Sequence, residues 1–504
     1  MKNEKILIIG FILLIHPCLG LGNPFDTIEK EPTLELAYSS GLLNDEIGLE
    51  PTWSRIFKQP GEQVPRGGKL VHTTDGGFLI GSTTILETGY REYWLLKTDA
   101  DGVEQWNASY KYFMTGYTGM VWLTNIIQTS DNGFTLIGTT ETSSDWDVWL
   151  LRIDENGVEE WNQTYDGPEN NRDYASAVYT TPDGGYLIGA FTRDPATTGN
   201  NYLFDYWLIK TDANGIEQWN RTYDGLGNDE SFPFIPTKDG NFLFGGPSAS
   251  SNDGIYQIWL IKVNTSGNIL WEQYYSATNT SESLAVMKNA LIETADGGIL
   301  LAGYTSSAGT DWWDTGYDYH IIKTDAAGEI EWTQEFGEDY NDIALVALQT
   351  TKGEYYIGGS YRKTSGDYTV DDMCLIKLSS SGEILWNFTY GEASVGDFIA
   401  DMVQIENSEA DEALIVLGGT ESFGAEDLDV WLGKFEIYSD TTTSIDTSTS
   451  TDSTTTSSTT NILEESSSTA SEDNSGFDLI TGTLVLVTVS TLTGFLRNKK
   501  RNQK

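Results

Sequence analysis

The chain has 504 residues, of which 75 are acidic and 29 are Lys or Arg. The formal net charge of −46 at pH 7 excludes nucleic acid as a partner, because phosphates require a basic surface. The two cysteines are Cys18 and Cys374, and Cys18 lies in a predicted export signal, so no intramolecular disulfide is expected.

The N-terminus has the features of a secretory signal. Lys2 and Lys5 precede an apolar run at 6–15, and small residues at Gly20 and Gly22 offer cleavage points, so we predict a signal peptide at 1–22. An acidic N-terminal extension at 23–52 follows.

A repeat dominates the middle of the chain. Its final tryptophan recurs at Trp53, Trp106, Trp161, Trp219, Trp271, Trp332 and Trp386. Each unit holds four short alternating runs, and in the third unit we expect strands at 175–181, 186–192, 206–211 and 216–223. Gly-containing turns at 182–185 and 212–215 separate the first strand from the second and the third from the fourth. The pattern predicts an all-β, seven-bladed β-propeller at 53–438.

The two ends of the array predict how the ring closes. Trp53–Phe57 is a lone fourth-type strand, whereas the last unit has three strands, at 397–405, 414–420 and 429–437. We expect the N-terminal strand to complete the last blade, with Arg55 beside Leu432, which removes the open edges of the array. The repeated tryptophans are expected to pack between blades.

The C-terminal part changes composition abruptly. Residues 439–475 are rich in Ser, Thr, Asp and Glu and predict an extended stalk. Residues 476–496 are long and apolar enough for one transmembrane helix, and the basic tail at 497–504 predicts the cytoplasmic side. We therefore expect a single-pass protein of the cell surface with an extracellular head. The alternative is a sorting segment that is removed after export.

The strand order predicts two different faces of the ring. The tight glycine turns lie on one face, the turn face. The second-to-third and fourth-to-first connections lie on the other, the loop face, and carry aromatic residues suited to binding a sugar or a peptide. The predicted ligand-binding residues are Trp146, Tyr202, Phe204, Trp312, Trp313, Tyr317, Tyr368 and Phe423. The alternative is that these side chains fold back over the blades.

Acidic residues recur at the start of the first strand of the units. They are Asp173, Asp229 (followed by Glu230), Glu282, Asp342 and Asp397. If the first strand lines the central channel, these carboxylates would form a ring that holds a cation, with Ca²⁺ as the candidate. The alternative is that each caps a local backbone turn. No other cofactor is expected.

Six sequons offer glycosylation candidates. The asparagines are Asn107, Asn162, Asn220, Asn264, Asn279 and Asn387. Four of them directly follow a blade-ending tryptophan, so copying of the repeat is the alternative explanation.

Catalytic constellations are missing from the sequence. Beyond the signal the histidines are His72 and His320, far apart in the repeat, which leaves no His–Cys metal cluster and no Ser-His-Asp unit. No pair among the many carboxylates is singled out for glycoside chemistry.

From Trp53 to Ile437 the chain resembles a family of exported archaeal and bacterial repeat propellers, grouped with the quinoprotein-like (PQQ-like) propellers. The motifs that carry the resemblance are Asp-Gly-Gly-Phe/Tyr-Leu-Ile, Trp-Leu-Ile-Lys-Thr-Asp and Trp-Asn-x-Thr-Tyr. The resemblance implies the fold and suggests a quinoprotein-like enzyme as one alternative. Such enzymes commonly have eight blades and an adjacent cysteine pair, from which this chain departs.

Three functions follow as hypotheses. The leading one is a non-enzymatic surface protein whose propeller binds a glycan, a peptide or another envelope protein. The alternatives are a quinoprotein-like or carbohydrate-active enzyme, and a purely structural component of the cell envelope.

Overall fold

The computed structural model describes residues 49–438 apart from short connecting segments. These segments are 59–61, 87, 115–116, 119, 143–144, 168–171, 194–202, 226–232, 250–255, 277–281, 308–316, 338–341, 363–370, 392–395, 407–409, 424 and 426–427. The predicted signal peptide, stalk, span and tail lie outside the described residues. Within the described part no helix is long and apolar enough to cross a membrane.

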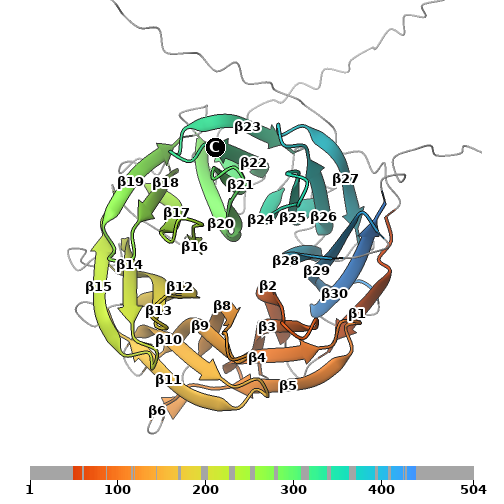
Figure 1. The fold of residues 1–504 in the computed structure, drawn as a ribbon. Coiled ribbons are helices and arrows are strands. Elements are labelled where there is room, and N and C mark those ends of the chain that lie inside the picture. Colours follow the sequence, from red (N-terminus) through yellow and green to blue (C-terminus); the bar gives the residue numbers. More distant parts are fainter. Residues whose placement is uncertain are drawn as a thin grey trace, which may run out of the picture. The chain divides into compact units, whose positions relative to one another are not determined.

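The described strands form a ring of seven four-stranded blades, as predicted (Figure 1). In each blade the first strand lies next to the centre and the fourth at the rim. One parallel contact, Asn289 with Val346, joins β20 of blade 5 to β24 of blade 6. Outside the blades, a two-stranded hairpin that the repeat did not predict connects blades 1 and 2.

The strand bounds follow the repeat closely. Blades 1 and 2 with the connecting hairpin contain β2 (Glu62–His72), β3 (Phe78–Ile85), β4 (Arg91–Thr98), β5 (Glu104–Tyr110), β6 (Phe113–Met114), β7 (Tyr117–Thr118), β8 (Val121–Gln128), β9 (Phe134–Glu141), β10 (Trp146–Ile153) and β11 (Glu159–Tyr165). Blades 3 and 4 contain β12 (Asp173–Thr180), β13 (Tyr186–Arg193), β14 (Phe204–Thr211), β15 (Glu217–Tyr223), β16 (Phe234–Pro236), β17 (Phe242–Ala249), β18 (Tyr256–Val263) and β19 (Ile269–Tyr275). Blades 5 and 6 contain β20 (Glu282–Glu293), β21 (Ile299–Ser307), β22 (Tyr317–Thr324), β23 (Ile330–Phe336), β24 (Ile343–Gln349), β25 (Tyr355–Arg362), β26 (Asp371–Leu378) and β27 (Ile384–Tyr390). Blade 7 contains β28 (Asp397–Ile405), β29 (Glu412–Thr420), β30 (Asp429–Ile437) and β1 (Trp53–Phe57).

The N-terminal strand closes the ring as the sequence predicted. β1 pairs antiparallel with β30, and Arg55 lies opposite Leu432. Trp53 then takes the place of the blade-ending tryptophan of blade 7. Its indole lies against Gly102 of blade 1, where an added Cβ would be 2.7 Å from the ring.

Successive blades are joined by a repeated contact on the turn face. Trp161 at the rim of blade 2 covers Gly215 in the Asp-x-x-Gly turn of blade 3, and the Tyr165 hydroxyl donates to the Gly215 carbonyl oxygen at 2.6 Å. Gly215 has a φ of +75°, which other residues adopt only with strain. The same tyrosine bond occurs from Tyr110 to Gly157, Tyr223 to Gly267 and Tyr275 to Gly328.

The Asp-Gly-Gly turn binds a buried lysine of its own blade. Lys210 donates to Asp183 at 2.9 Å and is 5% exposed. A Cβ at Gly185 would lie 2.8 Å from the Lys210 Nζ, so the second glycine makes room for the ammonium. Hydrogen bonds from Thr181 and Lys210 lower the pKa of Asp183 to about 2. Equivalent ion pairs are Asp75–Lys97, Asp131–Arg152, Asp239–Lys262 and Asp296–Lys323.

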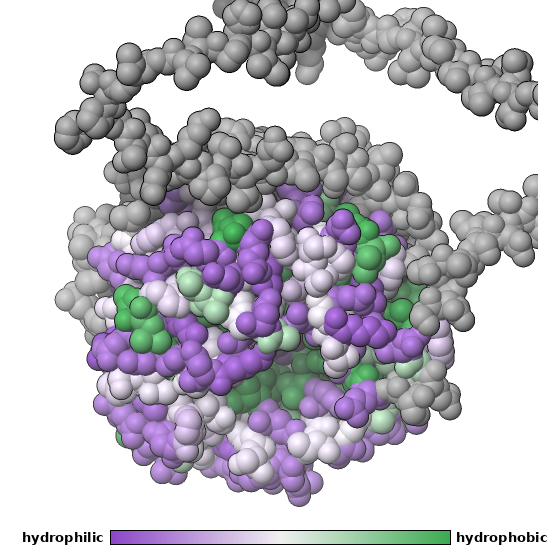
Figure 2. Space-filling view, turned by 45° about the horizontal axis from the view of Figure 1, so that its top comes forward, coloured by the Kyte–Doolittle hydropathy of each residue, from purple (hydrophilic) through white to green (hydrophobic). Residues whose placement is uncertain are grey.

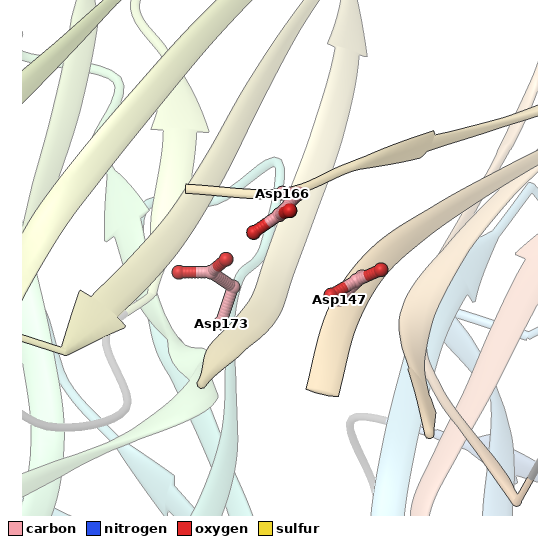
Figure 3. Close-up of side chains that lie close together, drawn as sticks. All are labelled: Asp147, Asp166 and Asp173. Atoms are coloured by element: carbon pink, nitrogen blue, oxygen red, sulfur yellow. The ribbon is translucent and has the colours of Figure 1, made fainter. Parts of the chain in front are cut away.

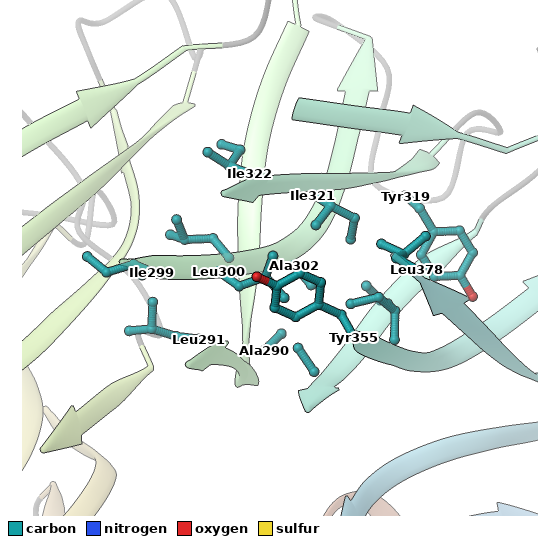
Figure 4. Packing of buried hydrophobic residues seen from close by; sticks show 14 of the residues in the cluster. Ala290, Leu291, Ile299, Leu300, Ala302, Tyr319, Ile321, Ile322, Tyr355 and Leu378 are labelled. Carbon is teal, nitrogen blue, oxygen red and sulfur yellow. The ribbon is translucent and has the colours of Figure 1, made fainter. Parts of the chain in front are cut away.

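The core lies between the blades rather than in one central mass. In the largest cluster, Leu300 and Ile321 of blade 5 pack in one group with Tyr355 of blade 6 (Figure 4). Each sheet supplies side chains on both of its faces, so each seam between blades is filled from two sides. Hydrophilic residues dominate the visible surface, and hydrophobic residues gather in separate patches (Figure 2).

The contact between blades can be tested with two glycine variants. Gly215→Ala and Gly184→Ala both place a side chain at positive φ (+75° and +82°), which costs roughly 1 kcal/mol. The Cβ at Gly184 meets nothing within 4 Å, whereas that at Gly215 meets Trp161 at 2.7 Å. We expect Gly215→Ala to lower the free energy of unfolding by a further 1–3 kcal/mol, roughly, in chemical denaturation. Equal losses in the two variants would contradict tight packing of the tryptophan on the turn.

Candidate functional site

The aromatic residues of the loop face gather at the seam between blades 2 and 3. We call Trp122, Trp146, Tyr174, Phe191 and Phe204 the aromatic cluster. Neighbouring ring centroids are 4.3 Å apart for Trp122 and Trp146, 6.4 Å for Trp146 and Tyr174, and 5.1 Å for Tyr174 and Phe191. Phe204 contacts Tyr174 and Phe191, both at 5.6 Å. The cluster is therefore continuous across five strands.

A pocket of about 590 Å³ opens beside this cluster. Its lining residues are Trp122, Leu123, Thr124, Thr139, Trp146, Arg172, Tyr174, Ala175 and Phe191. They come mainly from the starts of the innermost strands β8 and β12, with contributions from β9, β10 and β13. The guanidinium of Arg91 lies over the Trp122 ring at 4.4 Å, a cation–π contact at the edge of this site.

Three carboxylates meet at the same seam. Two of them belong to residues that adjoin pocket residues in the chain. Asp147 comes from β10, Asp173 from the start of β12, and Asp166 directly follows β11 (Figure 3). One oxygen from each lies within 4.8 Å of the others. We call these three residues the acid cluster. Among the residues that the structure describes, it is the one grouping of three or more His, Cys, Asp or Glu side chains suited to a metal ion.

The environment of the acid cluster favours the neutral form of its carboxyls. Asp173 is 0% exposed, Asp147 is half-buried and Asp166 is exposed. Burial, followed by the charges of Asp166 and Asp145, raises the pKa of Asp147 to about 7. Burial also raises the pKa of Asp173 to about 7, although its Oδ2 accepts a hydrogen bond from the Gly167 N–H at 2.5 Å.

The same arrangement recurs at other seams, with two carboxylates instead of three. A Cβ at Gly337 would lie 2.1 Å from an Asp318 oxygen and 3.0 Å from one of Asp342. At Gly391 the equivalent distances are 2.8 Å to Asp372 and 2.6 Å to Asp397. At these three seams an acid of the third strand thus lies near an acid of the next blade's first strand, and Gly337 and Gly391 each lie close to both side chains.

The first-strand acids were predicted from the sequence, whereas their third-strand partners were not. The signal was present, because an acid stands two residues before the buried third-strand position in six of the seven blades. These acids are Glu92, Asp147, Asp205, Asp318, Asp372 and Asp429. The Trp-Leu-Ile-Lys-Thr-Asp motif begins at the buried position and therefore leaves them out.

The predicted first-strand acids occupy separate seams. Asp173, Asp342 and Asp397 are each 0% exposed. Asp342 accepts the Arg362 N–H at 3.1 Å, and Asp397 accepts hydrogen bonds from Thr420 and Ser422. These contacts correspond to the capping alternative. Asp229 and the Glu282 side chain lie outside the described residues.

The predicted loop aromatics divide into three groups. Trp146 and Phe204 join the aromatic cluster. Tyr317 contacts Tyr304 at 4.9 Å in blade 5, and Phe423 stacks on Tyr390 at 4.7 Å over the core. The remaining four, Tyr202, Trp312, Trp313 and Tyr368, lie outside the described residues. Tyr174 and Phe191 were not predicted. The sequence feature that could have identified them is their aromatic character, because other blades mostly have non-aromatic residues at the same repeat positions.

The sequon asparagines have structural partners of their own. Asn162 and Asn220 are exposed, and each accepts a hydrogen bond from a buried third-strand indole, Trp149 and Trp207 respectively. Asn107 is exposed and donates to Glu104. Asn264 caps its turn by accepting from two backbone N–H groups, and Asn387 is 7% exposed. Asn279 lies outside the described residues.

Cys374 and His320 are both buried. Cys374 is a buried free cysteine. Burial lowers the pKa of His320 to about 4, so its imidazole is neutral at pH 7. Both residues fill the third-strand position that tryptophan takes in other blades.

No protein-family model matches the sequence, and no curated protein sequence matches it. Among solved structures, the chain is similar to a protein of unknown function from Bacteroides caccae, at 12% identity over 66% of this chain and 94% of that one, with a TM-score of 0.33. It is also similar to a protein of unknown function from Dyadobacter fermentans, at 10% identity over 77% and 99% of the two chains and a TM-score of 0.42. The GH93 α-L-arabinofuranosidase of Fusarium graminearum aligns at 10% identity over 61% and 91%, also with a TM-score of 0.42. At these scores the likeness carries no inference about activity or ligand.

The raised pKa of Asp173 predicts a pH dependence of stability. Its carboxyl has a pKa of about 7 in the folded chain, compared with an ordinary value of 3.8, which we take for the unfolded chain. The contribution of Asp173 to the free energy of unfolding therefore falls as the pH rises from about 4 to about 7. We expect Asp173→Asn to raise the melting temperature relative to the parent at pH 8, by roughly 2 °C, and by less at pH 5. Thermal unfolding of both proteins at the two pH values measures the difference.

Asp183→Asn is the matched control for this experiment. The pKa of Asp183 is lowered to about 2, so its contribution is complete at both pH values and is lost only as the pH falls through that value. The control should therefore destabilise the protein equally at pH 5 and pH 8. A constant effect of Asp173→Asn across this range would contradict the raised pKa.

Proposed function

We propose that the chain is a non-enzymatic surface protein that binds a glycan in the pocket between blades 2 and 3. The observation that carries the proposal is the continuous aromatic cluster beside a pocket of about 590 Å³ on the loop face. This volume falls within the usual range for small-ligand sites, roughly 300–1,000 Å³. Flat ring faces next to hydroxyl groups suit the apolar faces and hydroxyls of sugar rings.

The chemistry of the pocket favours binding over catalysis. The acid cluster supplies carboxyls with raised pKa values, but none of the three lines the pocket. Asp173 is 0% exposed, so it has no access to a substrate that occupies the pocket. Export by the segment at 1–22 and anchoring by the segment at 476–496 complete the proposal, which places the pocket outside the cell.

The location of the site can be tested with two aromatic variants at equivalent positions. Trp146 and Tyr317 each stand three residues before the buried third-strand position and are half-buried, but only Trp146 lines the pocket. We expect Trp146→Ala in the full-length chain to weaken glycan binding about tenfold or more, since one lost ring contact corresponds to roughly 1–2 kcal/mol. Tyr317→Ala should bind like the parent.

A glycan array followed by calorimetry measures these affinities, and melting temperatures establish that both variants fold. Equal effects of the two variants would contradict the proposed location. A parent chain that binds no glycan but retains an envelope protein in a pull-down would replace the glycan with a protein partner.

The acid cluster supports a second role, binding of a divalent cation at the same seam. Asp173 Oδ1 has no hydrogen-bond partner among the described residues, and one oxygen from each of three carboxylates lies within 4.8 Å. Two oxygens of a shared Ca²⁺ ion are separated by at most about 5 Å, since each Ca–O distance is about 2.4 Å. A cation would also relieve the repulsion that otherwise favours protonation.

Calcium addition tests this role. At pH 7.5 we expect roughly 2 mM Ca²⁺ to raise the melting temperature of the full-length chain by a few degrees. Addition of EDTA should reverse the change. Asp166→Asn should abolish the response, because it removes one of the three carboxylates. Asp166 is exposed, so this change leaves no buried group unpaired. An unchanged melting temperature in Ca²⁺ would exclude a stabilising ion at the cluster.

A further inference from the structure

The charge of the pocket is opposite to that of the chain. Acidic side chains outnumber Lys and Arg by 75 to 29 in the sequence, yet none of the described residues that line the pocket is a carboxylate. Among the described lining residues the charged one is Arg172, whose side chain is exposed. Arg91 adds a second guanidinium at the edge, 4.4 Å from the Trp122 ring centroid.

The three carboxylates of the acid cluster do not line the pocket. Asp147 follows Trp146 in β10, and Asp173 precedes Tyr174 in β12. Because successive side chains of a strand point to opposite faces, Asp147 and Asp173 project from their strands on the face opposite to Trp146 and Tyr174.

Guanidinium groups select oxyanions that present two oxygens to their planar fork. An arginine can donate two parallel hydrogen bonds to a carboxylate or a sulfate, with a geometry that a neutral hydroxyl does not match. The Arg91 guanidinium is already placed over an indole, so less side-chain freedom is lost when it meets a ligand. A flat aromatic wall beside arginine therefore suits a sugar ring that carries an anionic group.

We infer that the pocket takes an acidic glycan, in which a uronate carboxylate or a sulfate ester pairs with Arg172 while the sugar ring lies against Trp146 and Tyr174. The inference rests on the proposed glycan function and names its substrate class. Uronate and sulfate share the chemistry that arginine recognises, and separate probes distinguish them.

Three probes test the inference with the full-length chain. They are a trimer of 1,4-linked galacturonic acid, its fully methyl-esterified form, and a sulfated disaccharide. The ester keeps the sugar ring and removes the charge. We expect the acid or the sulfated probe to bind at least tenfold more tightly than the neutral ester at low salt. This preference should weaken as the NaCl concentration rises from about 50 to 500 mM.

Arginine variants test whether Arg172 provides the positive charge that binds the anionic probe. Arg172→Gln should lower affinity for the anionic probe about tenfold and leave the neutral ester unchanged, and Arg172→Lys should recover only part of the loss because it lacks the planar fork. Arg221→Gln is the matched control, since Arg221 also lies over a tryptophan, Trp219 at 5.8 Å, but on the outer strand β15. It should bind both probes like the parent.

The outcomes separate this inference from the proposed function. Equal binding of acid and ester that Trp146→Ala abolishes would overturn the acidic specificity and leave the glycan site in place. Binding of the anionic probe that Arg172→Gln leaves unchanged would likewise overturn the acidic specificity. No binding of any glycan, on the array or in calorimetry, would overturn both.

Discussion

An indole of one blade lies on a glycine of the next, and the stability of the ring depends on this contact. Trp161 covers Gly215 while the Tyr165 hydroxyl bonds to the carbonyl of the same glycine. The contact needs three sequence features at once: a large ring, a turn glycine at positive φ without a Cβ, and a tyrosine four residues after the tryptophan. The tryptophan–glycine contact recurs at most seams of the described ring, and the tyrosine bond accompanies it for Tyr110, Tyr165, Tyr223 and Tyr275. Trp53 supplies the contact between the last blade and the first, against Gly102, and closes the ring on this face.

The division of the ring into two faces follows from that constraint. On the turn face, loss of the Asp-Gly-Gly aspartate would leave a buried ammonium unpaired, and loss of the rim tryptophan would leave its seam unfilled. The loop face carries no such requirement beyond the paired acids at the strand starts. Strand ends there can therefore acquire aromatic and basic side chains at one seam without disturbing the others. The aromatic cluster between blades 2 and 3 is a local departure of this kind.

Most of the fold could be predicted from the sequence because the same pattern of strands and turns occurs seven times. The strands Asp397–Ile405 and Asp429–Ile437 and the closing strand Trp53–Phe57 were predicted to the residue, as was the pairing of Arg55 with Leu432. The hairpin at Phe113–Met114 and Tyr117–Thr118 was not predicted, since it occurs once and has no repeat to support it. The site was only partly predicted. Trp146 and Phe204 were named from their loop position, but Tyr174 and Phe191 come from other strands and meet them only in three dimensions.

The acid cluster and the pocket share the strand starts that form them, and this links their behaviour. Asp147 and Asp173 are the chain neighbours of Trp146 and Tyr174, so any change in the spacing of the carboxyls also changes the spacing of the two rings. Repulsion between ionised carboxylates would move β10 and β12 apart at this end, whereas a proton or a cation would hold them together. Gly167 limits the inward movement, because its backbone N–H already lies 2.5 Å from Asp173 Oδ2. A change in the charge of these two carboxyls would therefore act on the same strand starts that carry the two rings.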